Sequence, residues 1–186
     1  MKPLTPGTPH AIIMVGIPGS GKTTFAERFA ETFQAPFIDD NKIAATAQSG
    51  DLAELLSGMM FREITKTKRT LLFEGATHSR ANRTRLAKEF KEKGYTPIFV
   101  WVQTDSKEAR RRATKKNGLS DDAFDTALKH FTAPTQQEKP IVLSGKHTYA
   151  SQLKIVLKRI ADDQRPQDTP PTPQRSERPQ RPVILR

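Results

Sequence analysis

The stretch from Gly16 to Thr23 has the residue types and spacing of a loop that binds phosphate groups. It reads G-x-x-x-x-G-K-T, follows the apolar run 11–15, and precedes a segment whose phenylalanines recur at helical spacing. Glycines let consecutive N–H groups turn inward around a polyphosphate, and the N-terminus of the following helix favours an anion. The motif therefore predicts binding of a nucleoside triphosphate.

Individual residues of this loop have distinct expected roles. The Lys22 ammonium is expected to reach the β- and γ-phosphates, and the Thr23 hydroxyl is expected to ligate Mg²⁺. The predicted cofactors are therefore ATP and Mg²⁺. The residues expected to bind the nucleotide here are Gly16, Pro18, Gly19, Ser20, Gly21, Lys22, Thr23 and Thr24.

Composition narrows the class of protein. The chain has 186 residues, which suits one domain with a sheet covered on both faces. It has no cysteine, so disulfides and thiolate metal sites are excluded, and its four histidines form no ligand pair at helical spacing. The proline-broken N-terminus has no apolar signal core, and no apolar run approaches the roughly 18 residues of a membrane span. We expect a soluble, cytoplasmic protein that does not bind a membrane.

The net charge indicates anionic partners. It is +11, with an isoelectric point near 10.1. Residues 164–186 contain five arginines against Asp168 and Glu177, so a net +8 remains for the rest of the chain. Nucleotides, nucleic acid and other phosphorylated molecules are the candidate partners.

Alternating strand and helix patterns predict an α/β domain with a mainly parallel, five-stranded sheet. In such sheets ligands bind at the carboxyl ends of the strands, so Asp39, Glu74, Asp105 and the loop 144–147 are expected beside the phosphate loop. The expected strands are 10–15, 36–38, 70–74, 97–102 and 140–143. The expected helices are 23–33, 51 to about 64 (capped by Ser49 or Asp51), 79–93, 107–116 (preceded by Asp105 or Ser106), one from Ser120, and 149–160.

The local composition divides the chain into three segments. Residues 1–9 are expected to be a flexible lead-in, 10–161 the folded domain, and 162–186 a disordered tail rich in proline and arginine. Two P-x-x-P patterns in the tail, 170–173 and 179–182, fit a ligand for a partner protein. A solubilising or charge-bearing role is the alternative.

Other classes of triphosphate-binding protein fit poorly. The chain lacks the N-K-x-D and D-x-x-G segments of GTPases, and it is too short for an AAA+ motor or a helicase. The remaining class is a compact phosphotransferase. Over about residues 10–161 the chain resembles P-loop kinases related to the kinase domain of polynucleotide kinase, which include zeta-type toxins and chloramphenicol phosphotransferase. The resemblance rests on the segments 16–24, 39–42, 72–75 and 80–85, and on Arg112 with Lys116.

The resemblance implies a three-layer P-loop NTPase fold of the kinase type, with a basic lid helix. It also implies roles for acidic residues. Asp39 would act as general base toward the acceptor hydroxyl, the alternative being that Asp39 or Asp40 only caps the next helix. Glu74, where the family usually has aspartate, would hold Mg²⁺ through water beside Thr23, and its length also makes it a candidate base.

Basic residues receive roles from the same resemblance. Arg112 and Lys116 would reach the transferring phosphoryl group from the lid, whereas the neighbouring Arg111 and Lys115 are expected on a solvated face. Lys42 stands where the family has an arginine that grips the acceptor, and Arg80 is the best further candidate for acceptor contact. His147 follows the last strand, where related kinases hold the adenine.

These features predict a kinase that transfers the γ-phosphoryl group of ATP to a hydroxyl acceptor, either a polynucleotide 5′-hydroxyl or a small molecule. Two rival functions are a non-enzymatic ATP-binding switch that acts through the proline-rich tail, and a nucleic-acid-binding module that ATP regulates. Deleting residues 164–186 separates the first rival from a kinase. A steep loss of binding with salt identifies the second.

Overall fold

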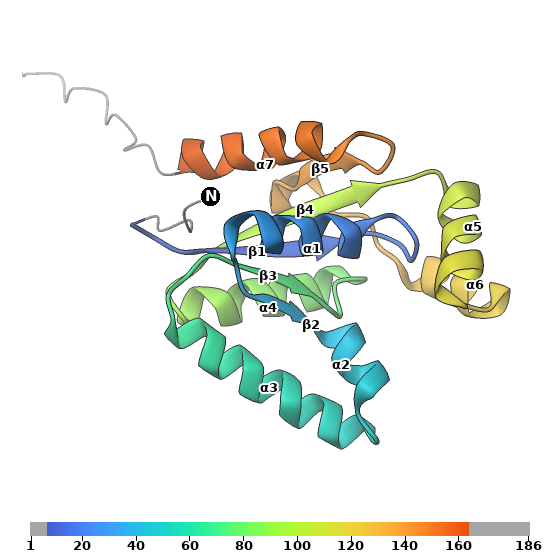
Figure 1. Cartoon of the computed structure of the whole chain (residues 1–186), viewed down its shortest axis with the longest axis horizontal. Coiled ribbons are helices and arrows are strands. Elements are labelled where there is room, and N and C mark those ends of the chain that lie inside the picture. Colours follow the sequence, from blue (N-terminus) through green and yellow to red (C-terminus); the bar gives the residue numbers. More distant parts are fainter. Residues whose placement is uncertain (1–6, 164–186) are drawn as a thin grey trace, which may run out of the picture.

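The structure, a computed structural model, describes residues 7–163, with the side chains of 116 and 117 excepted. A five-stranded sheet in the order β2-β3-β1-β4-β5 forms its centre, and every neighbouring pair of strands is parallel (Figure 1). The predicted fold class is confirmed. The strands are β1 (His10–Val15), β2 (Phe37–Asp39), β3 (Leu71–Glu74), β4 (Thr96–Gln103) and β5 (Ile141–Ser144).

Helices connect the strands, and side-chain caps set where several of them begin. The Ser79 and Ser120 hydroxyls accept hydrogen bonds from main-chain N–H groups in the first turn of their helices, as predicted. Of the open alternatives, Ser49 caps α3 and Asp105 caps α5. The helices are α1 (Lys22–Phe33), α2 (Asp40–Thr46), α3 (Gly50–Lys66), α4 (Arg80–Glu92), α5 (Ser106–Asn117), α6 (Asp121–His130), the 3₁₀ turn η1 (Gln136–Glu138) and α7 (Tyr149–Asp163).

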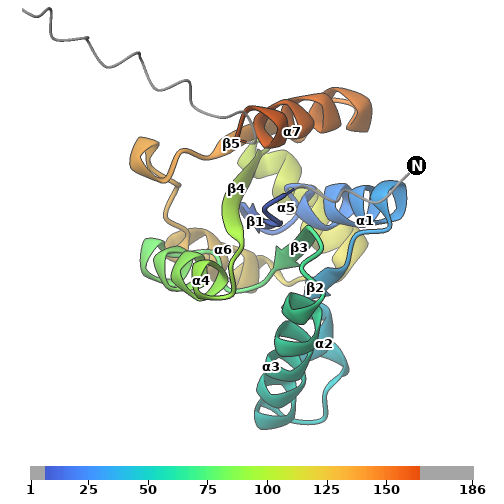
Figure 2. The same cartoon turned by 90° about the vertical axis from the view of Figure 1, so that its left-hand side faces the viewer.

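The sheet is the middle of three layers. Alternate residues of β1 face opposite sides, so that Ile12 joins one apolar cluster and Ile13 the other. The first cluster contains the inner faces of α1 and α7, and the second contains those of α4 and the end of α3. Figures 1 and 2 show α1 with α7 on one side of the sheet and α4 on the other. This arrangement holds β1 fully buried and aims its carboxyl end at the phosphate loop.

The helix α3 differs from its sequence pattern. Its apolar residues share one face, but most of that face is exposed, with Leu55 at 55% and Met59 at 48%. Figure 2 shows α2 and α3 extending away from the rest of the domain. Only the C-terminal part of α3 meets the core, through Phe61 and Ile64. The amphipathic period was therefore a correct sign of a helix but not of a buried one.

Arg83 lies in the segment 80–85, on which the family resemblance partly rests, and its role in the structure is internal. It is fully buried. Its guanidinium binds both Glu138 carboxylate oxygens, at 2.6 and 3.1 Å, and donates to the main-chain oxygens of Thr77 and Thr132. Arg83 thus fastens the segment after α6 to the loop after β3.

Among residues 7–163, no helix is long and apolar enough to cross a membrane. Most of the predicted lead-in and almost all of the predicted tail fall on residues 1–6 and 164–186, which lie outside the described residues.

Candidate active site

The phosphate loop lies against helix α5, and this contact explains one of its glycines. Gly19 has φ of +74°, and a Cβ there would collide with the main-chain oxygen of Ala109 and lie 2.9 Å from the Ala113 nitrogen. Ala109 and Ala113 are themselves fully buried and form an apolar cluster with Ile17 and Phe124. The loop and the base of the predicted lid are therefore packed together by residues with small or no side chains.

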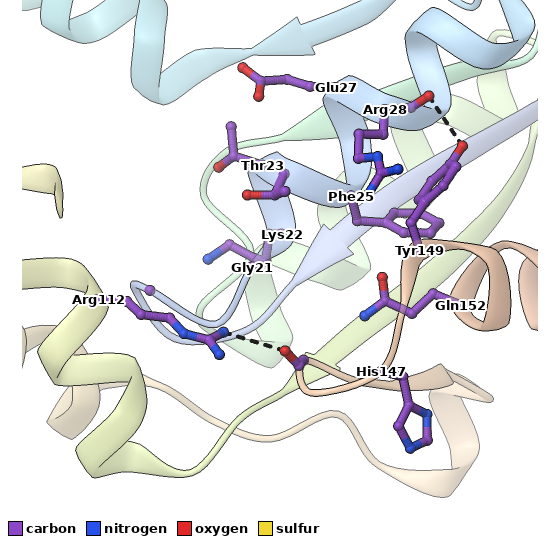
Figure 3. A pocket seen from close by; sticks show the side chains of 13 residues that line it. Gly21, Lys22, Thr23, Phe25, Glu27, Arg28, Arg112, His147, Tyr149 and Gln152 are labelled. Atoms are coloured by element: carbon purple, nitrogen blue, oxygen red, sulfur yellow. Dashed lines mark hydrogen bonds between the residues drawn. The ribbon is translucent and has the colours of Figure 1, made fainter.

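A cavity of about 610 Å³ opens above the first turn of α1. The phosphate loop forms its floor, α5 contributes Arg112, and the loop between β5 and α7 closes another wall (Figure 3). Six predicted nucleotide-binding residues line it: Gly19, Gly21, Lys22, Thr23, Thr24 and His147. Gly16 and Pro18 instead line a second cavity on another side of the loop, and Ser20 is buried beneath the loop.

Lys22 and Thr23 line the larger cavity, and the buried Glu74 contacts both of them. The Thr23 hydroxyl donates to Glu74 Oε1 at 3.1 Å, and Lys22 Nζ lies 3.8 Å from the same oxygen. Lys22 also donates to the main-chain oxygen of Ile17 at 3.1 Å. Burial lowers the pKa of Lys22, which Glu74 opposes, and burial raises the pKa of Glu74, which Lys22 and Thr23 oppose. An anion beside Lys22 and a cation beside Glu74 would each favour the charged form of that group.

The residues present fit Mg²⁺ and a triphosphate. Glu74 Oε2 and Ser20 Oγ are buried, and neither has a hydrogen-bond partner among the described residues. Buried polar atoms without partners are unusual, and a bound cation or anion supplies what they lack. Mg²⁺ is usually held by one or two carboxylates together with substrate phosphates, which matches the Glu74 carboxylate beside the Thr23 hydroxyl. Glu74 and Thr23 would hold the metal, and Lys22 with the loop N–H groups would hold the phosphates.

Asp39 lies beside Glu74 because the last residues of β2 and β3 pair in register. The Asp39 carboxylate acts electrostatically on both Lys22 and Glu74, so it belongs to the same charged cluster. Its Oδ1 also accepts from the Lys42 main-chain N–H at 3.0 Å and caps α2. Asp39 therefore does cap α2, but this cap uses only one of its two carboxylate oxygens.

Asp40, the other candidate, faces a different environment from Asp39. Its Oδ1 is buried without a partner among the described residues, and its Oδ2 lies close to Gly75. Burial raises the pKa of Asp40, an effect that Ser57 opposes. Asp40 does not appear among the groups that act on Lys22 or Glu74. Of the two aspartates, Asp39 is the one that the fold joins to the phosphate loop.

Helix α5 brings Arg112 to the nucleotide cavity. Arg112 donates to Glu108 Oε1 at 2.8 Å and to the Gly145 main-chain oxygen at 3.4 Å, a contact drawn in Figure 3. Arg111 binds the same carboxylate and is exposed, as predicted for a solvated face. Together the two arginines hold the pKa of Glu108 at about 2. The side chain of Lys116, the other predicted lid cation, lies outside the described residues.

Two predicted acceptor contacts do not reach either cavity at the phosphate loop. Arg80 is exposed and donates to Gln137 Oε1 at 2.8 Å, on the outer side of α4. Lys42 is also exposed and lines a largely apolar groove between α2 and α3, together with Asp39. Their expected roles toward an acceptor stay predictions.

Sequence reasoning missed the outer wall of the nucleotide cavity. Tyr149 donates to the Arg28 main-chain oxygen at 3.1 Å, and the Arg28 guanidinium lies 4.4 Å from the centre of the Tyr149 ring (Figure 3). Gln152 donates to the Ser144 main-chain oxygen and fixes the loop after β5. Gly145 in that loop admits no side chain, since a Cβ would lie 2.6 Å from the Ser20 oxygen and collide with the Thr104 hydroxyl. These contacts join segments far apart in sequence, so no local pattern predicted them.

Comparison with known proteins assigns the family. Residues 12–140 match the model of the AAA_33 family, described as an AAA domain, and the chain belongs to this family. No curated protein matches the chain significantly.

Solved structures with this fold include P-loop kinases. A gluconokinase from Sinorhizobium meliloti 1021 has a TM-score of 0.62 at 16% identity, covering 84% of this chain and 94% of its own. The APS kinase CysC of Mycobacterium tuberculosis, in complex with AMPPNP and APS, has a TM-score of 0.58 at 16% identity, covering 84% and 99%. A chain of the Pnkp1/Rnl/Hen1 RNA repair complex has a TM-score of 0.59 at 19% identity, covering 73% of this chain and 46% of that one. The predicted likeness to P-loop kinases is confirmed for the fold.

Proposed function

We propose that this protein is an ATP- and Mg²⁺-dependent kinase that transfers the γ-phosphoryl group to a hydroxyl acceptor. The observation that carries the proposal is that Lys22 and Thr23, which line the 610 Å³ cavity, both contact Glu74, whose buried Oε2 has no hydrogen-bond partner among the described residues. A glycine-rich turn that served only the fold would not need a buried lysine beside a buried glutamate whose Oε2 has no hydrogen-bond partner among residues 7–163. The kinase fold of the structural neighbours supports the same reading.

In the proposed reaction the protein positions and neutralises charge. When bound, Mg²⁺ offsets negative charge on the β- and γ-phosphates. Lys22 exchanges its bond to the Ile17 oxygen for the phosphates, and Arg112 approaches them from α5 once Glu108 releases it. The packing of α5 on the loop keeps water away from the same face.

We assign the general base to Asp39. Its Oδ1 holds the cap of α2, so Oδ2 is the oxygen that receives the proton of the acceptor hydroxyl. The acceptor oxygen forms a bond to the γ-phosphorus while the bond from that phosphorus to the bridging oxygen breaks, and ADP leaves with the bridging oxygen. Glu74 is already committed to Thr23 and the metal position, which favours Asp39 over Glu74 as base.

Two substitutions test the assignment. Lys22→Ala should abolish turnover and weaken ATP binding, whereas Asp39→Asn should lower turnover about 10²- to 10⁴-fold and leave ATP binding intact. Asparagine caps helices as well as aspartate does, so the second variant keeps α2 in place. Lys88→Ala and Asp51→Asn, both on exposed surfaces, are the matched controls. Transfer at the normal rate by Asp39→Asn rules out this base.

A further inference from the structure

A second cavity, of about 370 Å³, lies on another side of the phosphate loop from the nucleotide cavity. Lys22 lines both cavities, so a triphosphate held at Lys22 borders the second one. The proposed base Asp39 is two residues from Asn41 of this lining but is not itself a lining residue. Three segments enclose this space: the start of α2, the loop after β3, and the end of α6. Its lining residues beyond the phosphate loop are Asn41, Gly75, Thr77, His78, Ala127, His130 and Phe131.

The second cavity is poor in permanent positive charge. Among the described residues that line it, Lys22 is the only lysine or arginine, and in the proposed function Lys22 binds the triphosphate. The arginines nearest in sequence are turned to other partners: Arg83 is buried against Glu138, and Arg80 binds Gln137. The charge that makes the chain basic thus lies elsewhere, including on the outer face of α4, where Arg85 pairs with Glu89.

The groups that remain suit a neutral ligand with hydroxyl groups. Asn41 offers an amide, and His78 and His130 offer imidazoles from separate segments. Phe131 adds an aromatic side chain to the lining. The walls are fixed: the Thr132 main-chain N–H donates to the His78 oxygen at 2.8 Å, and the Thr77 hydroxyl donates to the Met14 oxygen at 2.9 Å.

From these observations we infer that the acceptor is a small, uncharged polyhydroxylated compound, of the size of a monosaccharide or a nucleoside, and that it binds in this second cavity. The inference rests on the proposed kinase function and adds the class of its substrate. A volume near 370 Å³ falls at the lower end for small-molecule sites. Binding of a polynucleotide instead needs several lysine or arginine contacts to phosphates, which these walls do not offer.

The closing experiment offers labelled ATP and Mg²⁺ with a panel of acceptors to the full chain. The panel contains neutral sugars, polyols and nucleosides, an anionic counterpart of each sugar, and a 5′-hydroxyl oligonucleotide. We expect transfer to at least one neutral member, at least tenfold slower transfer to its anionic counterpart, and none to the oligonucleotide. Transfer mainly to the oligonucleotide or an anionic member, or to no neutral member while MgATP binds, overturns the inference. Failure to bind MgATP at all instead refutes the proposed function.

A pair of tryptophan substitutions on α6 locates the site. Ala127→Trp fills the cavity and should lower transfer to the neutral acceptor at least tenfold, with the Kd for ATP unchanged. Ala123→Trp places the same side chain one turn earlier, at an exposed position away from the cavity, and should leave transfer unchanged. Circular dichroism checks that both variants fold. Equal transfer by the two variants places the acceptor elsewhere.

Discussion

The ion pair between Arg83 and Glu138 gives a sharp prediction of stability. The Arg83 side chain is fully buried and the Glu138 side chain is 10% exposed, with two hydrogen bonds joining them. Glu138→Gln keeps the shape but removes the negative charge, so a buried guanidinium is left uncompensated. Removing one partner of a buried ion pair lowers the free energy of unfolding by about 3–5 kcal/mol. We expect the lower end of this range because glutamine still accepts one hydrogen bond.

Urea unfolding followed by the fluorescence of Trp101, the single tryptophan, measures this loss. The matched control is Glu89→Gln, which breaks the exposed pair with Arg85, whose side chains are 59% and 37% exposed. Such surface pairs contribute about 0.5 kcal/mol or less. A loss below about 1 kcal/mol for Glu138→Gln at pH 7, or one equal to the control, refutes the claim that this pair fastens the two segments.

The same variant has a predictable dependence on pH. Burial alone raises the pKa of Glu138, but hydrogen bonds from Arg83 and Thr135 outweigh it and hold that pKa below the usual 4.5. A carboxylate whose pKa is lower in the folded than in the unfolded state stabilises the fold at pH values above its unfolded pKa. This stabilisation is lost as the pH falls through its folded pKa. The difference between wild type and Glu138→Gln should therefore be constant above about pH 5 and shrink in more acidic urea series. An undiminished difference at the acid end contradicts an electrostatic origin.

Two further predictions concern the phosphate loop. Gly19→Ala should destabilise the domain and abolish ATP binding, because the new methyl group would collide with the main chain of Ala109. The control is Gly58→Ala, inside α3, which should leave the melting temperature unchanged or raise it. In wild type, Mg²⁺-dependent ATP affinity should decrease as the pH is lowered, with a midpoint above 4.5, the ordinary pKa of glutamate. Burial raises the pKa of Glu74, and a protonated carboxyl does not ligate the metal. Glu74→Gln should weaken this affinity at neutral pH and remove its acid-side change in a fluorescence titration; an unaltered profile assigns the pH dependence to another group.

The order of elements was predictable because each strand and helix carries its own local signal. The buried run 11–15 and the serine caps before α4 and α6 fixed where elements begin, and parallel strands necessarily bring their carboxyl ends together. That topology alone placed Glu74 and Asp39 side by side beside Thr23. The grouping of these residues at the phosphate loop could thus be predicted from one motif and one rule of sheet geometry.

Side-chain direction was less predictable. Arg83 stands at the spacing of Leu86 and Phe90 on the inner face of α4, a signal that it is buried, but its partner Glu138 is 55 residues away in sequence. The apolar face of α3 that carries Leu55 is the opposite case: its spacing suggests burial, but the face is largely exposed because the helix extends from the domain. Both cases depend on contacts between distant segments, which local patterns do not encode.

Calorimetric titration of the full chain with ATP in the presence of Mg²⁺ tests the central claim most directly. The arrangement of Lys22, Thr23 and Glu74 predicts a single site, binding weakened when Mg²⁺ is withheld, and weaker binding by Lys22→Ala than by wild type. Lys88→Ala should bind as wild type does. No uptake of ATP by the folded wild-type chain, or equal uptake by Lys22→Ala, contradicts a nucleotide site at this loop.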